Sequence, residues 1–344
     1  MKNVPASKNV LSRLRIDPFI LGILCSVAIA CLLPARGGAA PVAEDATTVA
    51  IGLLFFLYGS RLSPAEALAG VRHWRLHLTV FSATFVMFPL LGVLARVLVP
   101  TVLTPQLYVG VLFLCMLPST VQSSIAFTSI AKGNVAAAVC SASFSSIIGI
   151  VLTPLLVAWL INTSGGGFSA HSILDIVLQL LVPFLLGQLT RRWTADWIGA
   201  HKKVLSVVDR GSILLVVYTA FSAGVVAGIW HQLTVLRFAG LIAVNSLLLV
   251  LALCITTFAA RRLGFGRADR ITIVFCGSKK SLAAGLPMAA VLFGHGAALG
   301  LIVLPLMLFH QIQLMVCAAL ARRWGARVPV EPAVPAVGVT VSTE

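Results

Sequence analysis

The chain has 344 residues, of which 59% are apolar and only 10% charged, whereas a soluble domain is about half apolar and a quarter charged. This composition excludes an ordinary soluble protein. A formal net charge of +15 would suggest nucleic-acid binding in a soluble chain. Here, however, Lys and Arg lie in short clusters between apolar runs, as in the cytoplasmic loops of membrane proteins. We expect a membrane protein whose partner is the lipid bilayer, with no nucleic acid.

Apolar runs close to the length of a bilayer crossing, roughly 20 residues, recur along the chain. They predict an all-α membrane protein with ten transmembrane helices at about 17–34, 46–60, 74–99, 106–131, 134–161, 171–190, 206–229, 235–260, 270–294 and 297–321. One transporter domain, 17–325, would then lie between a cytoplasmic N-terminal segment, 1–16, and a disordered cytoplasmic tail, 326–344.

The distribution of positive charge predicts the orientation. With the N-terminus inside, nearly all Lys and Arg residues fall in inner loops; the exceptions are Arg36, Arg96 and Arg237 outside, and Lys279 and Lys280 within an apolar segment. Short loops rich in Lys and Arg stay in the cytoplasm. We therefore expect both termini in the cytoplasm and a location in the cell (inner or plasma) membrane.

An internal repeat relates the two halves of the chain. Gly149 and Pro154 in the fifth helix have the same spacing as Gly300 and Pro305 in the tenth, with similar apolar residues between them. Because five is odd, halves at about 17–161 and 171–322 would enter the membrane in opposite orientations. Such an inverted repeat is typical of secondary transporters, although chance similarity between apolar stretches is the alternative.

The fourth helix of each half is expected to be broken. Pro118 removes a backbone donor amid hydroxyl and amide side chains at bilayer depth, and in the second half Gly277 and Ser278 precede two lysines. Lys279 and Lys280 would each cost roughly 2.5–3.5 kcal/mol in the centre of a span, while the acidic residues lie at helix ends or in loops. An unpaired lysine there favours an anionic ligand, unless it reaches an interface or neutralises a helix C-terminus.

Polar side chains in these breaks, together with two in the tenth helix, form the candidate substrate and ion site: Ser119, Thr120, Gln122, Ser123, Ser124, Cys276, Ser278, Lys279, Lys280, Ser281, His310 and Gln311. For His310 and Gln311 a contact between helices is as good an explanation as a contact with substrate. The cysteines lack zinc or disulfide spacing, so we expect no metal or cofactor beyond a coupling ion, sodium or a proton.

Two residues near the helix ends have simpler expected roles. Arg61 ends the second helix and is either a cytoplasmic anchor or part of an inner vestibule. Asn134 is expected to cap the fifth helix, because Asn is favoured at that position.

The same segments resemble the bile acid:sodium symporter family (solute carrier family 10) over about residues 15–325. Ala131-Lys-Gly-Asn-Val135 is similar to that family's signature, and 275–287 and 304–313 resemble its YfeH-like and member-seven-like subgroup. The resemblance implies a panel domain of helices 1, 2, 6 and 7 and a core domain of helices 3–5 and 8–10, with unwound helices 4 and 9 crossing near the bilayer centre.

The resemblance also implies sites for two sodium ions beside this crossing in members that couple to sodium. Ser123 and Ser124 would lie near the ion ligands of the first half, and Ser141, Ser143 and Ser145 around those of helix 5.

The chain departs from the family in the helix 9 break. Bile acid carriers have a Glu and a Gln there, where this chain has Phe275 or Cys276 and Lys279. A fixed ammonium group in place of a sodium ligand would repel the ion, which argues against sodium coupling at both sites. Lys279 is then either an internal substitute for the ion or a group that exchanges a proton.

The leading function is secondary transport of a small organic anion by alternating access, coupled to sodium or protons or merely facilitative. No Walker A pattern occurs, so ATP-driven transport by this chain alone is not expected. A membrane enzyme is disfavoured, since HExxH and GxSxG are both missing and the candidate polar residues lack a carboxylate within the spans. A regulator or sensor of ion homeostasis is the other alternative. Substrate, stoichiometry and oligomeric state are left open.

Overall fold

A computed structural model describes residues 18–61, 73–162, 170–228 and 233–326 of the chain, and within these ranges the regular structure is entirely helical. The elements are α1 (Pro18–Leu32), α2 (Ala39–Arg61), α4 (Trp74–Ser82), the π-helix η3 (Ala83–Met87), α5 (Phe88–Leu94), the 3₁₀ helix η4 (Ala95–Leu98), α6 (Pro105–Met116), α7 (Val121–Ile130), α8 (Val135–Asn162), α9 (Ala170–Ala200), α10 (Lys202–Val226), α11 (Val235–Arg262), α12 (Arg267–Gly277), α13 (Leu282–Phe293) and α14 (Leu299–Gly325). The predicted N-terminal segment and nearly all of the predicted tail lie outside the described residues.

Six continuous helical runs in the described part of the chain are long and apolar enough to cross a membrane, and the bent pair α6 and α7 makes a seventh candidate. The helix α1 is apolar but shorter. Each predicted range contains helix in the structure. The all-helical, multi-pass character is therefore confirmed, whereas ten crossings and an inverted repeat stay predictions.

Two predicted helix boundaries are wrong by seven residues or more. The helix α2 begins at Ala39 rather than near 46, so Glu44 and Asp45 lie in its second turn. The helix α9 continues past residue 190 to Ala200. Both extensions contain charged residues, so hydropathy placed the ends of the apolar runs and missed the ends of the helices.

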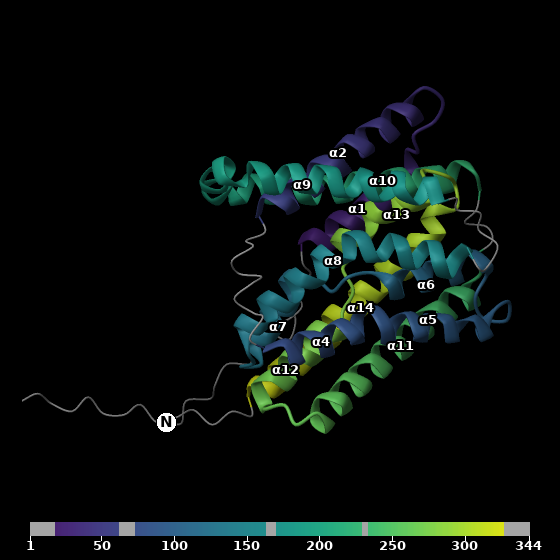
Figure 1. The fold of residues 1–344 in the computed structure, drawn as a ribbon. Helices are drawn as coiled ribbons and strands as arrows, with labels where there is room; N and C mark the ends of the chain where they lie inside the picture. The colour runs from purple at the N-terminus through teal and green to yellow at the C-terminus, as the bar shows by residue number, and fades with distance from the viewer. Residues whose placement is uncertain (1–17, 62–72, 163–169, 229–232, 327–344) are drawn as a thin grey trace, which may run out of the picture.

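The helices pack in two groups. In one group α1 packs against α10, α10 against α2, and α2 against α9; Figure 1 shows α2, α9 and α10 along one side of the molecule. The other group contains α4 to α8 and α11 to α14, with α6 packed against both α5 and α14. The groups meet where α10 contacts α13 and α14, and where α9 contacts α8 and α13.

Backbones touch directly where α2 meets α9. A Cβ atom added to Gly59 would lie 2.0 Å from the carbonyl oxygen of Phe184, and one added to Gly187 would lie 2.1 Å from that of Phe56. No side chain fits at either position, and small residues are what allow membrane helices to approach so closely. This contact joins the two helices tightly.

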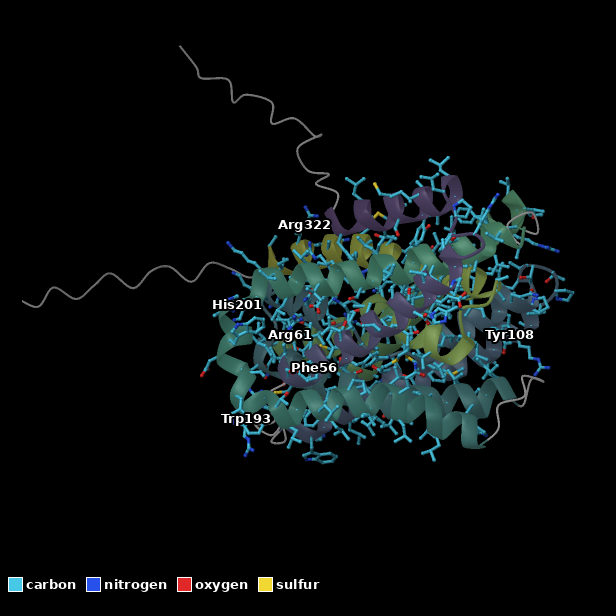
Figure 2. The ribbon with its side chains drawn as sticks, turned by 90° about the horizontal axis from the view of Figure 1, so that it is seen from above. Phe56, Arg61, Tyr108, Trp193, His201 and Arg322 are labelled. Atoms are coloured by element: carbon cyan, nitrogen blue, oxygen red, sulfur yellow. The ribbon has the colours of Figure 1, made fainter. Side chains whose placement is uncertain are left out.

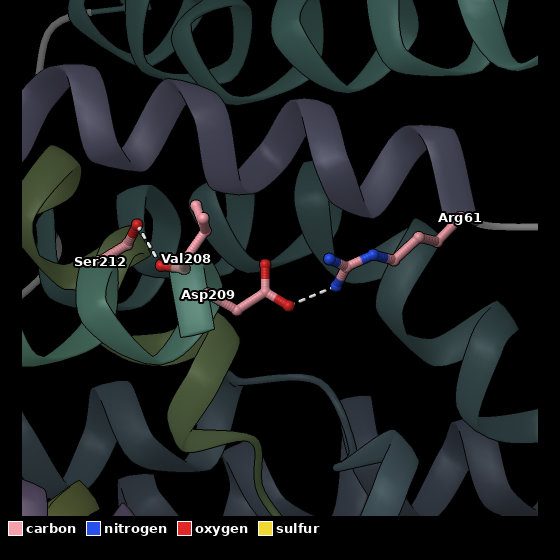
Figure 3. A network of polar contacts seen from close by, with 4 residues as sticks. All are labelled: Arg61, Val208, Asp209 and Ser212. Carbon is pink, nitrogen blue, oxygen red and sulfur yellow. Dashed lines mark hydrogen bonds and ion pairs between the residues drawn. The ribbon is translucent and has the colours of Figure 1, made fainter. Parts of the chain in front are cut away.

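The first group also contains an ion pair. Arg61, at the C-terminal end of α2, donates to the Asp209 carboxylate of α10 (Figure 3). The side chains are partly buried, and the pair lies beside the turn in which Ser212 Oγ donates to the carbonyl of Val208. This partner of Arg61 could not be predicted from the sequence, because Asp209 is 148 residues away along the chain.

The ends of the molecule differ in the residues that they carry. Figure 2 shows Arg61 of α2, Arg322 of α14 and His201 between α9 and α10 toward one end, and Tyr108 of α6 toward the opposite end. The C-terminal turns of α2 and α14 thus place their arginines at the same end.

Candidate functional site

The two helix breaks are hydrogen-bonded to each other. The helices α6 and α7 are bent by 61° at residues 117–120, and α12 and α13 are interrupted at residues 278–281. The Ser281 amide donates to the carbonyl of Pro118 at 2.9 Å, and Thr120 Oγ1 donates to the carbonyl of Lys280 at 2.8 Å. The second group of helices therefore contains two unwound segments, each of which supplies partners for the other.

Pro118 leaves carbonyls of α6 without helical partners. It has no amide hydrogen, and the amide of Ser119 donates to Ser145 Oγ on α8 at 2.9 Å rather than back to Cys115. Leu117 has an extended backbone directly after the last turn of α6, so its carbonyl lies outside the helical hydrogen-bond pattern. Buried carbonyls must find other donors.

The donor for these carbonyls is the ammonium group of Lys280. Its Nζ donates to the carbonyls of Thr84, Cys115 and Leu117 at 2.8, 2.8 and 2.7 Å. Three bonds exhaust its donors, and the residue is 0% exposed. The ring centroid of Phe88 lies 4.3 Å away. Lys280 thus neutralises the C-terminal end of α6, the alternative considered for one lysine from the sequence.

The third carbonyl, that of Thr84, is freed by the π-helix η3. In this turn the amide of Phe88 donates to the carbonyl of Ala83, five residues earlier. The residue five positions after Thr84 is Pro89, which has no amide hydrogen. Thr84 therefore has an unpaired carbonyl in its own helix, and Lys280 bonds to it.

Lys279 has different surroundings. It is also 0% exposed, but its Nζ lies 3.4 Å from Ser123 Oγ, longer than the usual 2.7–3.2 Å. The ring centroids of Phe127 and Phe275 lie 4.2 and 5.6 Å from the ammonium, which is favourable for a cation. Among the described residues the ion pair is that of Arg61 with Asp209, so neither lysine has a carboxylate partner there.

Gln313 of α14 positions the backbone of the second break. Its Oε1 accepts from the Lys280 amide at 2.9 Å, and its Nε2 donates to the Lys280 carbonyl at 2.8 Å. The same Nε2 lies 2.9 Å from His310 Nδ1. This His310 contact lies within α14, and Gln313 rather than the half-buried Gln311 bonds to the second break.

The predicted hydroxyl groups of α7 and its preceding turn also donate hydrogen bonds to the backbone beside the second break. Ser119 Oγ donates to the carbonyl of Cys276 at 2.6 Å, and Ser124 Oγ to that of Phe275 at 3.1 Å. Ser281 caps α13 by accepting from the Ala284 amide. These side chains serve the protein backbone in this conformation.

The remaining predicted residues are more dispersed. Ser278 Oγ donates to the carbonyl of Val274 in its own helix, and Ser141 Oγ lies 2.7 Å from His77 Nδ1. Ser143 is buried and Gln122 is exposed. The structure therefore brings most of the candidates together around the two breaks, whereas Ser141 contacts α4 and Gln122 is exposed on α7.

Four contributors were missed from the sequence: Thr84, Phe88, Gln313 and Thr153, whose Oγ1 donates to the Met116 carbonyl at 2.9 Å. Two of them could have been found from their positions in the sequence. Gln313 lies three residues after His310, on the same face of a helix, and Thr153 immediately precedes Pro154. Thr84 acts through its backbone, which side-chain patterns do not report.

Asn134 caps α8, as predicted. Its Oδ1 accepts from the Ala137 amide at 3.0 Å, and its Nδ2 donates to Asp269 Oδ1 of α12 at 2.9 Å. Thr272 Oγ1 donates to the carbonyl of Asn134 at 2.9 Å. The segment that resembles a family signature thus ties the start of α8 to α12.

Comparison with known families matches residues 17–326 to the SBF-like CPA transporter family. The chain belongs to this family. Protein PA2026 of Pseudomonas aeruginosa is 58% identical over 312 residues, covering 90% of this chain and 93% of that protein. "Putative symporter YfeH" of Escherichia coli (strain K12) is 55% identical over 309 residues, again 90% and 93%. "Sodium/bile acid cotransporter 7" of Xenopus tropicalis is 31% identical over 319 residues, covering 90% and 92%.

The match covers both helix breaks and both helix groups. It confirms the resemblance to the bile acid:sodium symporter type of transporter, including the YfeH and member-seven branch. The chain is accordingly a multi-pass membrane protein of a transporter family, with a small-molecule substrate and the bilayer as its partners.

Proposed function

We propose that this protein is a secondary transporter that moves a small organic anion across the cell membrane by alternating access. Membership of a transporter family supports the class of activity, and relatives carry the names of a symporter and a sodium/bile acid cotransporter. The choice of an anion rests on Lys279. A buried ammonium group with one long hydrogen bond and no carboxylate partner among the described residues attracts negative charge.

The position of Lys279 also supports alternating access. The residue is shielded from solvent in this conformation, while its neighbour Ser123 is half-buried and Gln122 on the same helix is exposed. An anion therefore reaches the ammonium only when packed helices separate. The group of α1, α2, α9 and α10 acts as the panel and the other group as the core, which moves against it.

In the full architecture ten helices cross the membrane as an inverted repeat, with the crossing of helices 4 and 9 near the bilayer centre. Helical ranges that agree with the ten predicted segments support this arrangement. Both termini lie in the cytoplasm of a cell whose inner or plasma membrane holds the protein, because Arg61 and Arg322 mark one end of the molecule as basic.

The anion proposal is tested with purified protein, by thermal unfolding and by uptake into liposomes. Acetate, succinate and taurocholate serve as mono-, di- and conjugated bile-acid anions. A bound anion raises the unfolding midpoint by mass action. An ammonium–carboxylate bond contributes about 1.5–3 kcal/mol, so Lys279→Met is expected to weaken binding about tenfold or more. Lys279→Arg, which keeps the charge, is the control.

Each outcome distinguishes between the functional hypotheses. An anion that stabilises the native protein, loses its effect in Lys279→Met and is carried into liposomes supports the proposal. Equal stabilisation of Lys279→Met would remove Lys279 from the site. A stabilising anion that never enters liposomes would contradict transport and favour a membrane sensor or regulator.

A further inference from the structure

We propose that the carbonyls of Thr84, Cys115 and Leu117 form a site for a monovalent cation, which the Lys280 ammonium group of the chain itself occupies. The oxygens lie 2.7 to 2.8 Å from Lys280 Nζ. The cation in this site is thus a side chain, covalently attached to the second break. We refer to the three oxygens as the carbonyl cage.

The ligands of the cage are the kind that hold alkali cations. Backbone carbonyl oxygens replace the hydration shell of a monovalent ion in selective membrane sites. Here all three are neutral main-chain groups, and the described residues contribute no carboxylate to Lys280. A single positive charge suits such a site, because the cage supplies partial negative charges only.

The cage exists independently of the lysine. Thr84 has a free carbonyl because of the π-turn and Pro89, and Cys115 has one because the Ser119 amide donates to Ser145. These causes lie in η3, α6 and α8, whereas Lys280 arrives from the break between α12 and α13. Removing the lysine side chain therefore leaves three buried oxygens facing one space, and unpaired carbonyls at membrane depth are costly. A small cation is their natural replacement partner.

Lys279 provides a matched comparison at the next position. It is equally buried, but the described residues offer its ammonium one hydroxyl at 3.4 Å and two aromatic rings. No set of carbonyls converges there, so removing Lys279 should not create a site of this kind.

The test measures thermal unfolding midpoints in detergent, at constant ionic strength, in sodium, potassium, methylammonium or choline chloride. Lys280→Ala is expected to be less stable than the native protein in choline, which is too large for the cage. Sodium, potassium or methylammonium should raise its midpoint by about 3 °C or more. Lys280→Met fills the space without charge and should show no cation effect, and neither should Lys279→Ala or the native protein.

The other results would overturn the proposal. If Lys280→Ala has the same midpoint in all four salts, no cation refills the cage. The same conclusion follows if Lys280→Ala fails to accumulate in every salt while Lys279→Ala accumulates. Equal stabilisation of the native protein and of Lys280→Ala by sodium over choline would place the cation outside the cage. None of these measurements uses a transported anion, so they stand apart from the test of Lys279.

Discussion

At the level of single residues, two neighbouring lysines in one break have opposite relations to their surroundings. Lys280 uses all three donors on backbone oxygens from two other elements, so its charge is a structural part of the core. Lys279 lies among aromatic rings with one distant hydroxyl, so its charge has fewer hydrogen-bond partners among the described residues. The formal positive charge is the same, and the neighbouring oxygens decide what each can do.

A residue-scale prediction concerns Gln313. Replacing Gln313 by Leu removes both hydrogen bonds to the Lys280 backbone. The Lys280 carbonyl keeps the bond from Thr120 Oγ1, but its buried amide is left unpaired, which costs about 1–3 kcal/mol. The unfolding midpoint should fall, since the free energy of unfolding decreases. Gln311→Leu, two residues away on a half-buried position, should change the stability by less than about 0.5 kcal/mol. Equal effects of the two changes would contradict the role given to Gln313.

At the level of helices, side-chain hydrogen bonds and direct backbone contact are two means by which elements are joined. In the group of α4 to α8 and α11 to α14, side chains satisfy interrupted backbones, as Thr153 does for Met116 and Ser124 for Phe275. In the other group α2 and α9 use bare backbone contact at Gly59 and Gly187. A helix break leaves backbone groups unpaired, and side chains supply their partners. Close backbone contact instead requires the absence of a side chain, as at Gly59 and Gly187.

An element-scale prediction follows for the glycines of α9. A Cβ at Gly187 would lie 2.1 Å from the Phe56 carbonyl oxygen, while one at Gly199 has nothing within 4 Å. Gly187→Ala should therefore destabilise the protein by about 1–3 kcal/mol through overpacking, or separate α2 from α9. Gly199→Ala is expected to be neutral or slightly stabilising, because Ala favours helix. The yield and unfolding midpoint of both proteins are the measurements, and a stable Gly187→Ala protein would show that α2 and α9 can shift.

At the scale of the whole molecule, hydropathy and Pro and Gly positions were enough to predict the helical segments and both breaks. They also predicted the Asn134 cap, because its partner is three residues away. The partners of Lys280 could not be predicted, since they lie 163 to 196 residues away along the chain. The π-turn at Ala83 and the pairing of Arg61 with Asp209 depend likewise on how distant helices pack.

The whole-molecule prediction concerns topology. Reporter fusions at each end of the chain should both report the cytoplasm, because an even number of crossings returns the C-terminus to the side of the N-terminus. Fusions after α2 and after α14 should agree with each other, since Arg61 and Arg322 lie toward the same end of the molecule. An external reporter at the C-terminus would refute ten crossings.

The hydrogen bonds of the two helix breaks also determine how fast their amide hydrogens exchange with deuterated solvent. A helix interrupted by proline usually exchanges its amide hydrogens quickly, because they lack acceptors. Here the amides of Ser119, Lys280 and Ser281 donate to Ser145, Gln313 and Pro118 respectively. Mass spectrometry after deuterium labelling should therefore find these unwound segments as slow to exchange as the helices beside them, and faster exchange should mark the surfaces where the two helix groups part.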